Sequence, residues 1–260
     1  MENLYQLVSE ASEQGHSVAM ATVVQVQGST PREVGAKMLI YADGRIAGTV
    51  GGGKMEAVVI EKAIEALRQG QSQMAHFDLI EPAEGDVGIC GGTADVFIDA
   101  IVPRPALLIV GGGHVAQPTA EIGAMCGFGV TVIDDREEMV AQERFPHADR
   151  RLTGDIVETL KSISIAPNTH IVIVTRGHAY DEDALRAVID SPAAYVGMIG
   201  SRRKAATIFD HLRADGIDEA RIARVHSPIG LNIGSQTPAE IAVSILAEII
   251  MLRRGKSCPT

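Results

Sequence analysis

Apolar and polar residues in the N-terminal part of the chain follow the periods of both strand and helix. Alternating or β-branched runs predict strands at residues 18–27, 36–41, 45–49, 73–80 and 94–100. The dipeptide Asp43-Gly44 lies between the second and third of these runs and predicts a tight hairpin. A helical period predicts helices at residues 4–14 and after the glycines 51–53. The pattern indicates a mixed α+β unit with a helix packed on a sheet.

The C-terminal part of the chain alternates short apolar runs with helical patterns. Strands are predicted at residues 106–110, 130–133, 171–175 and 194–199, and helices up to about residue 126 and over 136–145 and 181–189. We expect Asp181 to cap the last of these helices. Continuous apolar strands between helices are typical of a sheet buried on both faces, and such sheets are parallel. The sequence therefore predicts a doubly wound parallel α/β domain.

Two local signals delimit the units of the chain. The Pro-Arg-Pro motif at 103–105 restricts its neighbours to extended conformations, so we place a boundary between residues 1–103 and 104–260. Near the C-terminus, Thr237 and Glu240 stand at the spacing of a capping box, which predicts the start of a final helix.

The composition argues against several classes of function. The 260 residues carry 33 Asp and Glu against 23 Lys and Arg, a net charge of −10, which argues against a nucleic-acid partner. No apolar run reaches the roughly 20 residues of a membrane span, and the N-terminus lacks the pattern of a secretory signal, so we expect a cytoplasmic protein without membrane contact. The 3% aromatic content leaves few stacking platforms, so ligand binding must depend on backbone amides and charged groups.

The strongest chemical signal is a glycine-rich loop directly after the apolar run 106–110. Gly111, Gly113 and Ala116 fit the pattern GxGxxA, with His114 between them. The first glycine permits a tight turn, the second lets the backbone approach a pyrophosphate, and the alanine allows close helix packing.

An acidic residue follows this loop at the end of the next predicted strand. Asp134 occupies the position at which a carboxylate normally accepts a hydrogen bond from a ribose 2′-hydroxyl. Arg136 lies close enough in sequence to accommodate a 2′-phosphate instead. Together with the loop, these residues predict a Rossmann-like nucleotide-binding domain and leave the choice between NAD and NADP open.

Further polar residues follow two other predicted strands of the same sheet. Arg176 and His178 come after one strand, and Ser201, Arg202 and Lys204 after the other. Ligands of open α/β sheets bind at this edge, and these residues offer cations and hydroxyls to an anion. A solvated helix start explains the second segment equally well, and a loop histidine is the simpler interpretation of His178.

The N-terminal unit contains three glycine-rich loops with candidate chemistry. The first two, 28–32 and 48–56, predict a nest of amides for a phosphate or a polar ring. The candidate binding residues there are Arg32, Gly52, Gly53 and Lys54. The third loop, 88–92, presents the thiol of Cys90 with little shelter, so it could reach a ligand atom or a metal. Tight hairpin geometry alone also explains the glycines of the second loop.

These motifs together resemble the XdhC/CoxI family of xanthine dehydrogenase accessory proteins. The matching segments are residues 28–32, 35–38, 48–56, 88–92, 111–116, 134–136, 176–181, 197–204, 228–231 and 237–242. They follow one another in order over almost the whole chain. The resemblance implies a small XdhC-type domain before the Rossmann-like domain.

The resemblance also implies a role in the maturation of molybdenum enzymes. Members of the family bind molybdenum cofactor, cooperate with a cysteine desulfurase in its sulfuration, and deliver it to a xanthine dehydrogenase-type hydroxylase. Cys90 matches the cysteine associated with holding the cofactor, which makes it a tentative molybdenum ligand. CoxI-like members carry a second cysteine after the triple-glycine loop, where this chain has Lys54, and charge pairing with a phosphate is the expected substitute.

Alternatives remain open at this stage. The chain resembles a cofactor-handling protein more than an enzyme, but an NAD(P)-dependent oxidoreductase with His178 or Tyr180 as proton donor is the runner-up. A nucleotide-sensing module without molybdenum cofactor is a third interpretation. The sequence does not decide whether the Gly111 loop holds NAD(P) or molybdopterin, and it leaves a homodimer open.

Overall fold

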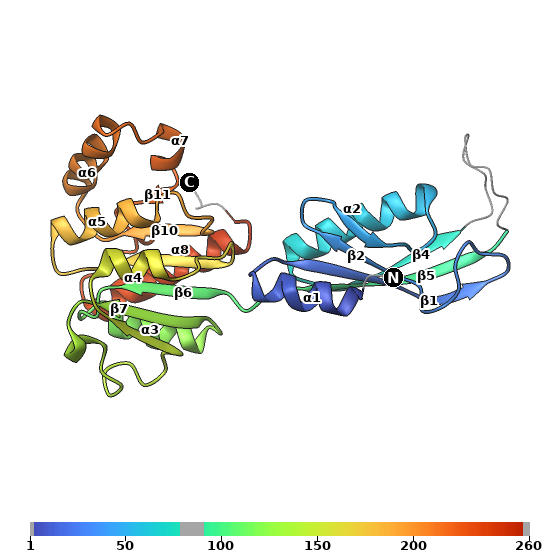
Figure 1. Cartoon of the computed structure of the whole chain (residues 1–260), viewed down its shortest axis with the longest axis horizontal. Coiled ribbons are helices and arrows are strands. Elements are labelled where there is room, and N and C mark those ends of the chain that lie inside the picture. Colours follow the sequence, from blue (N-terminus) through green and yellow to red (C-terminus); the bar gives the residue numbers. More distant parts are fainter. Residues whose placement is uncertain (1–2, 79–90, 257–260) are drawn as a thin grey trace. The chain divides into compact units, whose positions relative to one another are not determined.

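Residues 3–78 and 91–256 are described by the computed structural model, in which the chain forms two units, Met1–Pro103 and Arg104–Thr260. Each unit has its own sheet and its own helices (Figure 1). Cys90 lies outside the described residues.

The N-terminal unit is built on an antiparallel sheet in the order β3-β2-β1-β5-β4. Its strands are β1 (Val18–Gln27), β2 (Lys37–Tyr41), β3 (Ile46–Gly48), β4 (Gln73–Asp78) and β5 (Thr93–Ile101). Helix α2 (Gly53–Gln69) packs on one face through residues such as Val59 and Ala63, and α1 (Leu4–Glu13) packs on the other through Ala11. The predicted hairpin is confirmed, with Gly44 at a φ of 87° in its turn.

The C-terminal unit contains a parallel sheet in the order β11-β10-β9-β6-β7-β8. Its strands are β6 (Ala106–Val110), β7 (Gly129–Asp134), β8 (Arg150–Thr153), β9 (Thr169–Ile173), β10 (Tyr195–Met198) and β11 (Val225–His226). Its helices are α3 (Ala116–Met125), α4 (Ile156–Ser162), α5 (His178–Val188), α6 (Arg202–Ala214), α7 (Glu219–Ile222) and α8 (Pro238–Arg253). The predicted doubly wound sheet and the capping box of Thr237 and Glu240 are confirmed.

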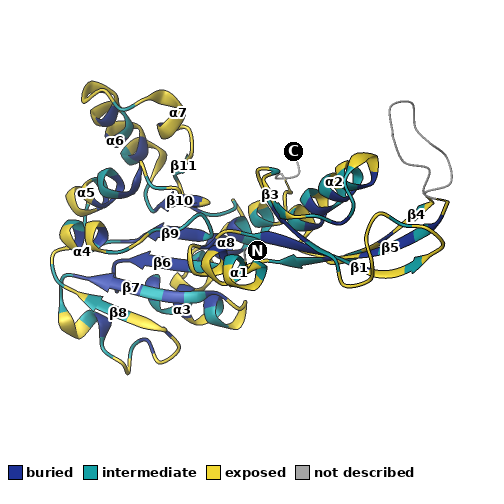
Figure 2. Ribbon diagram, turned by 45° about the vertical axis from the view of Figure 1, so that its right-hand side comes forward, coloured by how far each residue is buried: buried dark blue, intermediate teal, exposed yellow. Residues whose placement is uncertain are grey.

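Helices cover both faces of the parallel sheet, which explains its continuous apolar strands. Residues of α3 and α8, such as Ala120 and Ile245, form one core with Leu107 and Ile109 of β6. Residues of α4, α5 and α6 form the other core, which includes Leu108 and Val110 of the same strand. Strands β6, β7 and β9 are consequently buried along most of their length (Figure 2).

Several predictions for the C-terminal unit were wrong or incomplete. The helix predicted over 136–145 is only a 3-10 turn, η1 (Glu137–Val140), followed by an irregular segment. Strands β8 and β11 and helices α4 and α7 had no counterpart in the prediction, because each is too short to establish a period. Helix α5 begins at His178 after Gly177, so Asp181 lies inside its first turn and does not cap it.

Among the described helices, none combines the length and apolar character needed to cross a membrane.

Candidate functional site

A cleft of about 350 Å³ opens at the carboxyl edge of the parallel sheet. Its lining residues are Gly113, His114, Val115, Asp134, Arg136, Met139, Val174, Thr175, Arg176 and Ile199. They lie at or after the carboxyl ends of β6, β7, β9 and β10. The connections from β6 and β9 run to opposite sides of the sheet, so the cleft lies at the topological switch point, where doubly wound sheets bind ligands.

The glycine-rich loop after β6 fits closely against its surroundings except at Gly113. A Cβ on Gly111 would lie 2.5 Å from the carbonyl oxygen of Val174, and one on Gly112 would lie 2.3 Å from that of Met139. A Cβ on Gly113 would meet nothing within 4 Å. The first two glycines are therefore required by packing, whereas Gly113 lines the cleft and leaves space for a ligand to approach the backbone.

Asp134 ties this loop to β7. Its Oδ2 accepts hydrogen bonds from the Gly112 N–H at 2.8 Å and from Arg136 Nη2 at 3.2 Å. Its Oδ1 accepts from the Arg136 N–H at 3.1 Å and from Arg136 Nε at 2.9 Å. A carboxylate has about four acceptor positions, so the two residues fill those of Asp134.

The environment of Asp134 favours its charged form. Burial raises the pKa of the carboxyl, but the hydrogen bonds from Arg136 and from the Gly112 N–H outweigh burial and lower its pKa below the usual value. A ribose hydroxyl that bonded to this carboxylate would have to replace one of the Arg136 contacts.

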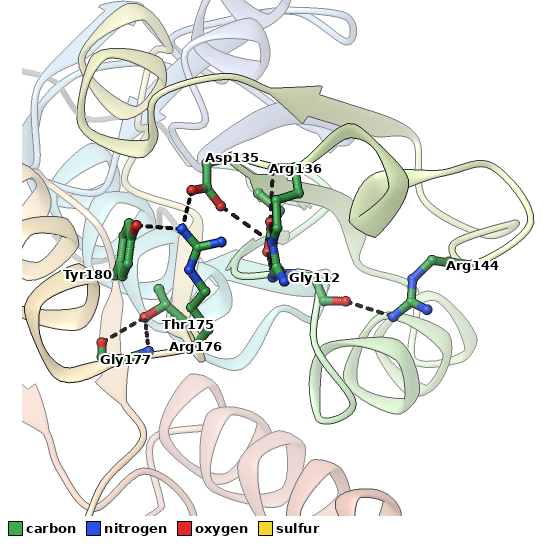
Figure 3. A network of polar contacts seen from close by, with 9 residues as sticks. Gly112, Asp135, Arg136, Arg144, Thr175, Arg176, Gly177 and Tyr180 are labelled. Atoms are coloured by element: carbon green, nitrogen blue, oxygen red, sulfur yellow. Dashed lines mark hydrogen bonds and ion pairs between the residues drawn. The ribbon is translucent and has the colours of Figure 1, made fainter.

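A second arginine contacts Asp135, the residue that follows Asp134. Arg176 Nη2 lies 2.7 Å from Asp135 Oδ2 and also donates to the hydroxyl of Tyr180, whose ring centroid lies 4.4 Å from the guanidinium carbon. Arg136 Nε lies 3.6 Å from Asp135 Oδ1. Figure 3 shows Arg176 between Asp135 and Tyr180, with Arg136 on the other side of Asp135. Two guanidinium groups thus converge on one carboxylate at the cleft.

A buried ion pair holds the loop that carries Arg176. The side chain of Asp181 is only 1% exposed, and its Oδ1 accepts from the N–H of Thr175 at 3.1 Å and from its hydroxyl at 2.7 Å. Its Oδ2 pairs with the ammonium of Lys204, which also donates to the Ile199 carbonyl oxygen at 3.2 Å. Lys204 is therefore neither a free cation for a ligand nor a solvated residue of the helix start, because its ammonium is paired with Asp181.

Other predicted residues of this unit lie around the cleft without lining it. Ala116 is buried at the start of α3. Ser201 caps α6 by accepting from the Lys204 N–H, and Arg202 is exposed in the first turn of that helix. His178 is exposed at the start of α5. The structure therefore brings Gly113, His114, Asp134, Arg136 and Arg176 together and leaves the other candidates of this unit outside the cleft lining.

Arg144 was missed by the sequence reasoning. It reaches the loop from the segment after η1, and its Nη2 donates to the Gly112 carbonyl oxygen at 3.0 Å. Its Nε is buried without a hydrogen-bond partner. No local pattern could have identified this contact, because it joins residues 32 positions apart.

The predicted amide nest of the N-terminal unit is occupied by a side chain of the same unit. Glu56 Oε2 accepts from the Thr49 hydroxyl at 2.6 Å, the Gly52 N–H at 3.2 Å and the Val50 N–H at 3.3 Å. A ligand phosphate at these amides would have to displace this carboxylate. The remaining candidates there are Arg32, Gly53 and Lys54, all of them exposed.

The described ranges contain no cluster of potential metal ligands. Within residues 3–78 and 91–256, no group of three or more His, Cys, Asp or Glu side chains is placed to hold a metal ion.

Comparison with known protein families shows to which family the chain belongs. Residues 107–249, more than half of the chain, match the family described as the XdhC Rossmann domain. This chain belongs to the XdhC family. Residues 11–78 match the XdhC and CoxI family, so the N-terminal unit carries the smaller domain that accompanies the Rossmann domain. The family resemblance inferred from the motifs is confirmed.

Curated relatives extend the similarity of this XdhC chain over its length. It is 38% identical over 255 residues to an uncharacterized protein of Escherichia coli, YqeB; the match covers 97% of this chain but 47% of YqeB, about half of that protein. It is 23% identical to a protein of Bacillus subtilis described as a subunit of a probable xanthine dehydrogenase, with 98% of each chain covered. It is 21% identical to the molybdenum cofactor insertion chaperone PaoD of E. coli, with 94% of this chain and 86% of PaoD covered.

A solved structure shares the fold. The crystal structure of a Bacillus halodurans protein described as a xanthine dehydrogenase is 21% identical, covers 97% of this XdhC chain and 96% of its own, and superposes with a TM-score of 0.55. This similarity extends the fold assignment to both domains.

Proposed function

We propose that this protein is an accessory chaperone that binds molybdenum cofactor as its cargo and inserts it into a xanthine dehydrogenase-type molybdenum hydroxylase. The family assignment supports this role. So do the names of two relatives that match nearly the whole chain, one described as part of a probable xanthine dehydrogenase and the other as a molybdenum cofactor insertion chaperone.

The observation that carries the proposal is the cleft at the switch point of the parallel sheet, where two arginines are paired with acidic side chains of the protein. Molybdopterin carries a phosphate, and the cleft offers the guanidinium groups of Arg136 and Arg176 beside the amides at the start of α3. Non-covalent contacts of this kind suit a carrier, because the cargo must later be released to the hydroxylase.

Two finer parts of the proposal rest on the family resemblance. We propose that a cysteine desulfurase cooperates with this protein when the cofactor receives its terminal sulfur. We also propose that the thiol of Cys90, which lies outside the described residues, is the soft ligand to the cofactor. Two further proposals do not rest on the resemblance. If a nucleotide fills the cleft, Arg32 and Lys54 are the counter-charges for the cofactor phosphate in the N-terminal unit. The proposed assembly is a homodimer.

A nucleotide-sensing module is the second candidate function. The specific observation in its favour is the GxGxxA loop directly at the switch point of a sheet in the order typical of dinucleotide-binding domains. In this alternative NAD(P) occupies the cleft, with or without molybdenum cofactor elsewhere.

Expression in a host that makes molybdenum cofactor tests the chaperone role. The purified protein is denatured, the released ligand is oxidised to a fluorescent pterin, and the yield is compared with the protein concentration. We expect near-stoichiometric pterin from the wild type and from Cys126→Ala, which alters an exposed thiol, and a large loss from Cys90→Ala. Absence of pterin from the wild type, together with tight NAD(P) binding, would favour the sensing module.

A further inference from the structure

One acidic side chain beside the cleft separates two cationic ones that line it. Asp135 lies 2.7 Å from Arg176 Nη2 and 3.6 Å from Arg136 Nε. The three side chains remain in contact with solvent, with 26% of Asp135, 32% of Arg136 and 38% of Arg176 exposed. Exposed ion pairs contribute little to stability and exchange their partners at low cost. The arrangement therefore differs from a fixed structural pair such as Asp181 and Lys204.

The hydrogen bonds of Asp134 favour an anion over a sugar diol as the ligand beside Arg136 and Arg176. The acceptor positions of Asp134 are filled by Arg136 and the Gly112 N–H, so a sugar diol finds no free carboxylate there. The guanidinium groups, in contrast, have more donors than Asp134, Asp135 and Tyr180 use. Unused donors on two residues that line a cleft favour a ligand with several acceptor oxygens.

We infer that Arg136 and Arg176 form a phosphomonoester site, and that the ligand phosphate takes the place which the Asp135 carboxylate occupies between them. A phosphomonoester carries close to two negative charges and three acceptor oxygens, against one charge and two oxygens for a carboxylate. Tyr180 holds the Arg176 guanidinium through its ring and hydroxyl, so this group stays in place when Asp135 moves away.

This inference deepens the proposed function, on which it rests for one of its two ligand sources. The terminal phosphate of molybdopterin is a phosphomonoester, and so is the 2′-phosphate that distinguishes NADP from NAD. The chemistry of recognition is the same in both cases, and two experimental arms separate the sources.

The nucleotide arm measures NADP⁺ and NAD⁺ affinity by titration calorimetry at fixed ionic strength. If NADP is the source, we expect the wild type to prefer NADP⁺, and Arg136→Gln and Arg176→Gln each to lose about tenfold in NADP⁺ affinity with little change for NAD⁺. Asp135→Asn removes the internal competitor, so NADP⁺ should bind several-fold more tightly. Arg221 lies on α7 and forms an exposed pair with Asp190; Arg221→Gln breaks this pair, is the matched control and should leave both affinities unchanged.

The pterin arm measures the fluorescent pterin that co-purifies with the same variants. If molybdopterin is the source, its yield should fall in Arg136→Gln and Arg176→Gln, rise or persist in Asp135→Asn, and stay at the wild-type level in Arg221→Gln. Circular dichroism melting curves of each variant show whether it is folded, and a variant that fails to fold is replaced by the Lys substitution, which keeps the charge and should retain part of the phosphate preference.

The outcomes distinguish this inference from the proposed function. A dependence on both arginines in either arm supports the site, even when the wild type contains no pterin and the chaperone role fails. Equal affinities for NADP⁺ and NAD⁺, together with a pterin yield that neither arginine variant lowers, overturn the site while leaving the chaperone role intact. Weaker binding in Asp135→Asn would show that Asp135 supports the arginines instead of competing with the ligand, and would overturn the displacement.

Discussion

The ion pair between Asp181 and Lys204 gives a quantitative test of how the cleft is held together. Asp181 is 1% exposed and Lys204 is 11% exposed. Lys204→Met removes the charge and keeps an apolar stem of similar length over Gly200, where the lysine chain now packs. The buried carboxylate would then keep only the N–H and the hydroxyl of Thr175 as donors. We expect a loss of about 3–5 kcal/mol in the free energy of unfolding, the usual cost of removing one partner from a buried pair.

A second variant separates the pair from the packing around it. Asp181→Asn alone should also destabilise the protein, because it leaves the ammonium of Lys204 without its counter-charge. In the double variant Lys204→Met/Asp181→Asn neither charge is buried alone. The double variant should therefore lose less than the sum of the two single losses, by an interaction energy of about 1–3 kcal/mol.

Urea unfolding followed by far-ultraviolet circular dichroism measures these differences, because the chain has no Trp for fluorescence. The transition of the C-terminal unit is the one expected to shift. Arg221→Met is the control, since its pair with Asp190 has side chains 50% and 62% exposed and should contribute about 1 kcal/mol or less. A loss for Lys204→Met no larger than that of this control, or single losses that simply add, would refute a stabilising buried pair.

Three further predictions concern the loop, the acid that holds it, and the N-terminal unit. Gly112→Ala should cost about 1–3 kcal/mol in urea unfolding because its Cβ would lie 2.3 Å from a backbone carbonyl oxygen, whereas Gly113→Ala should unfold like the wild type and weaken ligand binding; equal stability of the two would contradict the packing. Folding lowers the pKa of Asp134, so its carboxylate stabilises the folded protein. This stabilisation is complete above the ordinary pKa of 3.8 and is lost as the pH falls through the pKa of the folded state. The difference in melting temperature between wild type and Asp134→Asn should therefore shrink below about pH 4, and a constant difference would count against this. Glu56→Ala should cost about 1–3 kcal/mol by leaving the Thr49 hydroxyl and the Gly52 N–H without their acceptor, and thermal melting that matches the wild type would contradict the assignment.

The features that the sequence predicted correctly depend on residues close together in the chain. The GxGxxA loop lies between a strand and a helix because its glycines, its apolar run and its helix follow one another directly. The capping box of Thr237 and Glu240 closes within one helical turn. The hairpin at Gly44 needs only two neighbouring residues with suitable backbone freedom. Local sterics and local hydrogen bonds decide each of these features, so a pattern along the chain contains them.

The features that only the tertiary structure decided depend on partners far apart in the chain. Lys204 and Arg202 are two residues apart in the same basic run, yet one is buried against Asp181, 23 positions away, and the other faces solvent. Glu56 fills amides that the sequence assigned to a ligand. The sequence by itself determined that a glycine-rich loop follows a buried strand and precedes a helix. Folding decided which charges are neutralised within the protein and which stay accessible, because that depends on the side chains brought opposite each charge and on how much water is excluded around them.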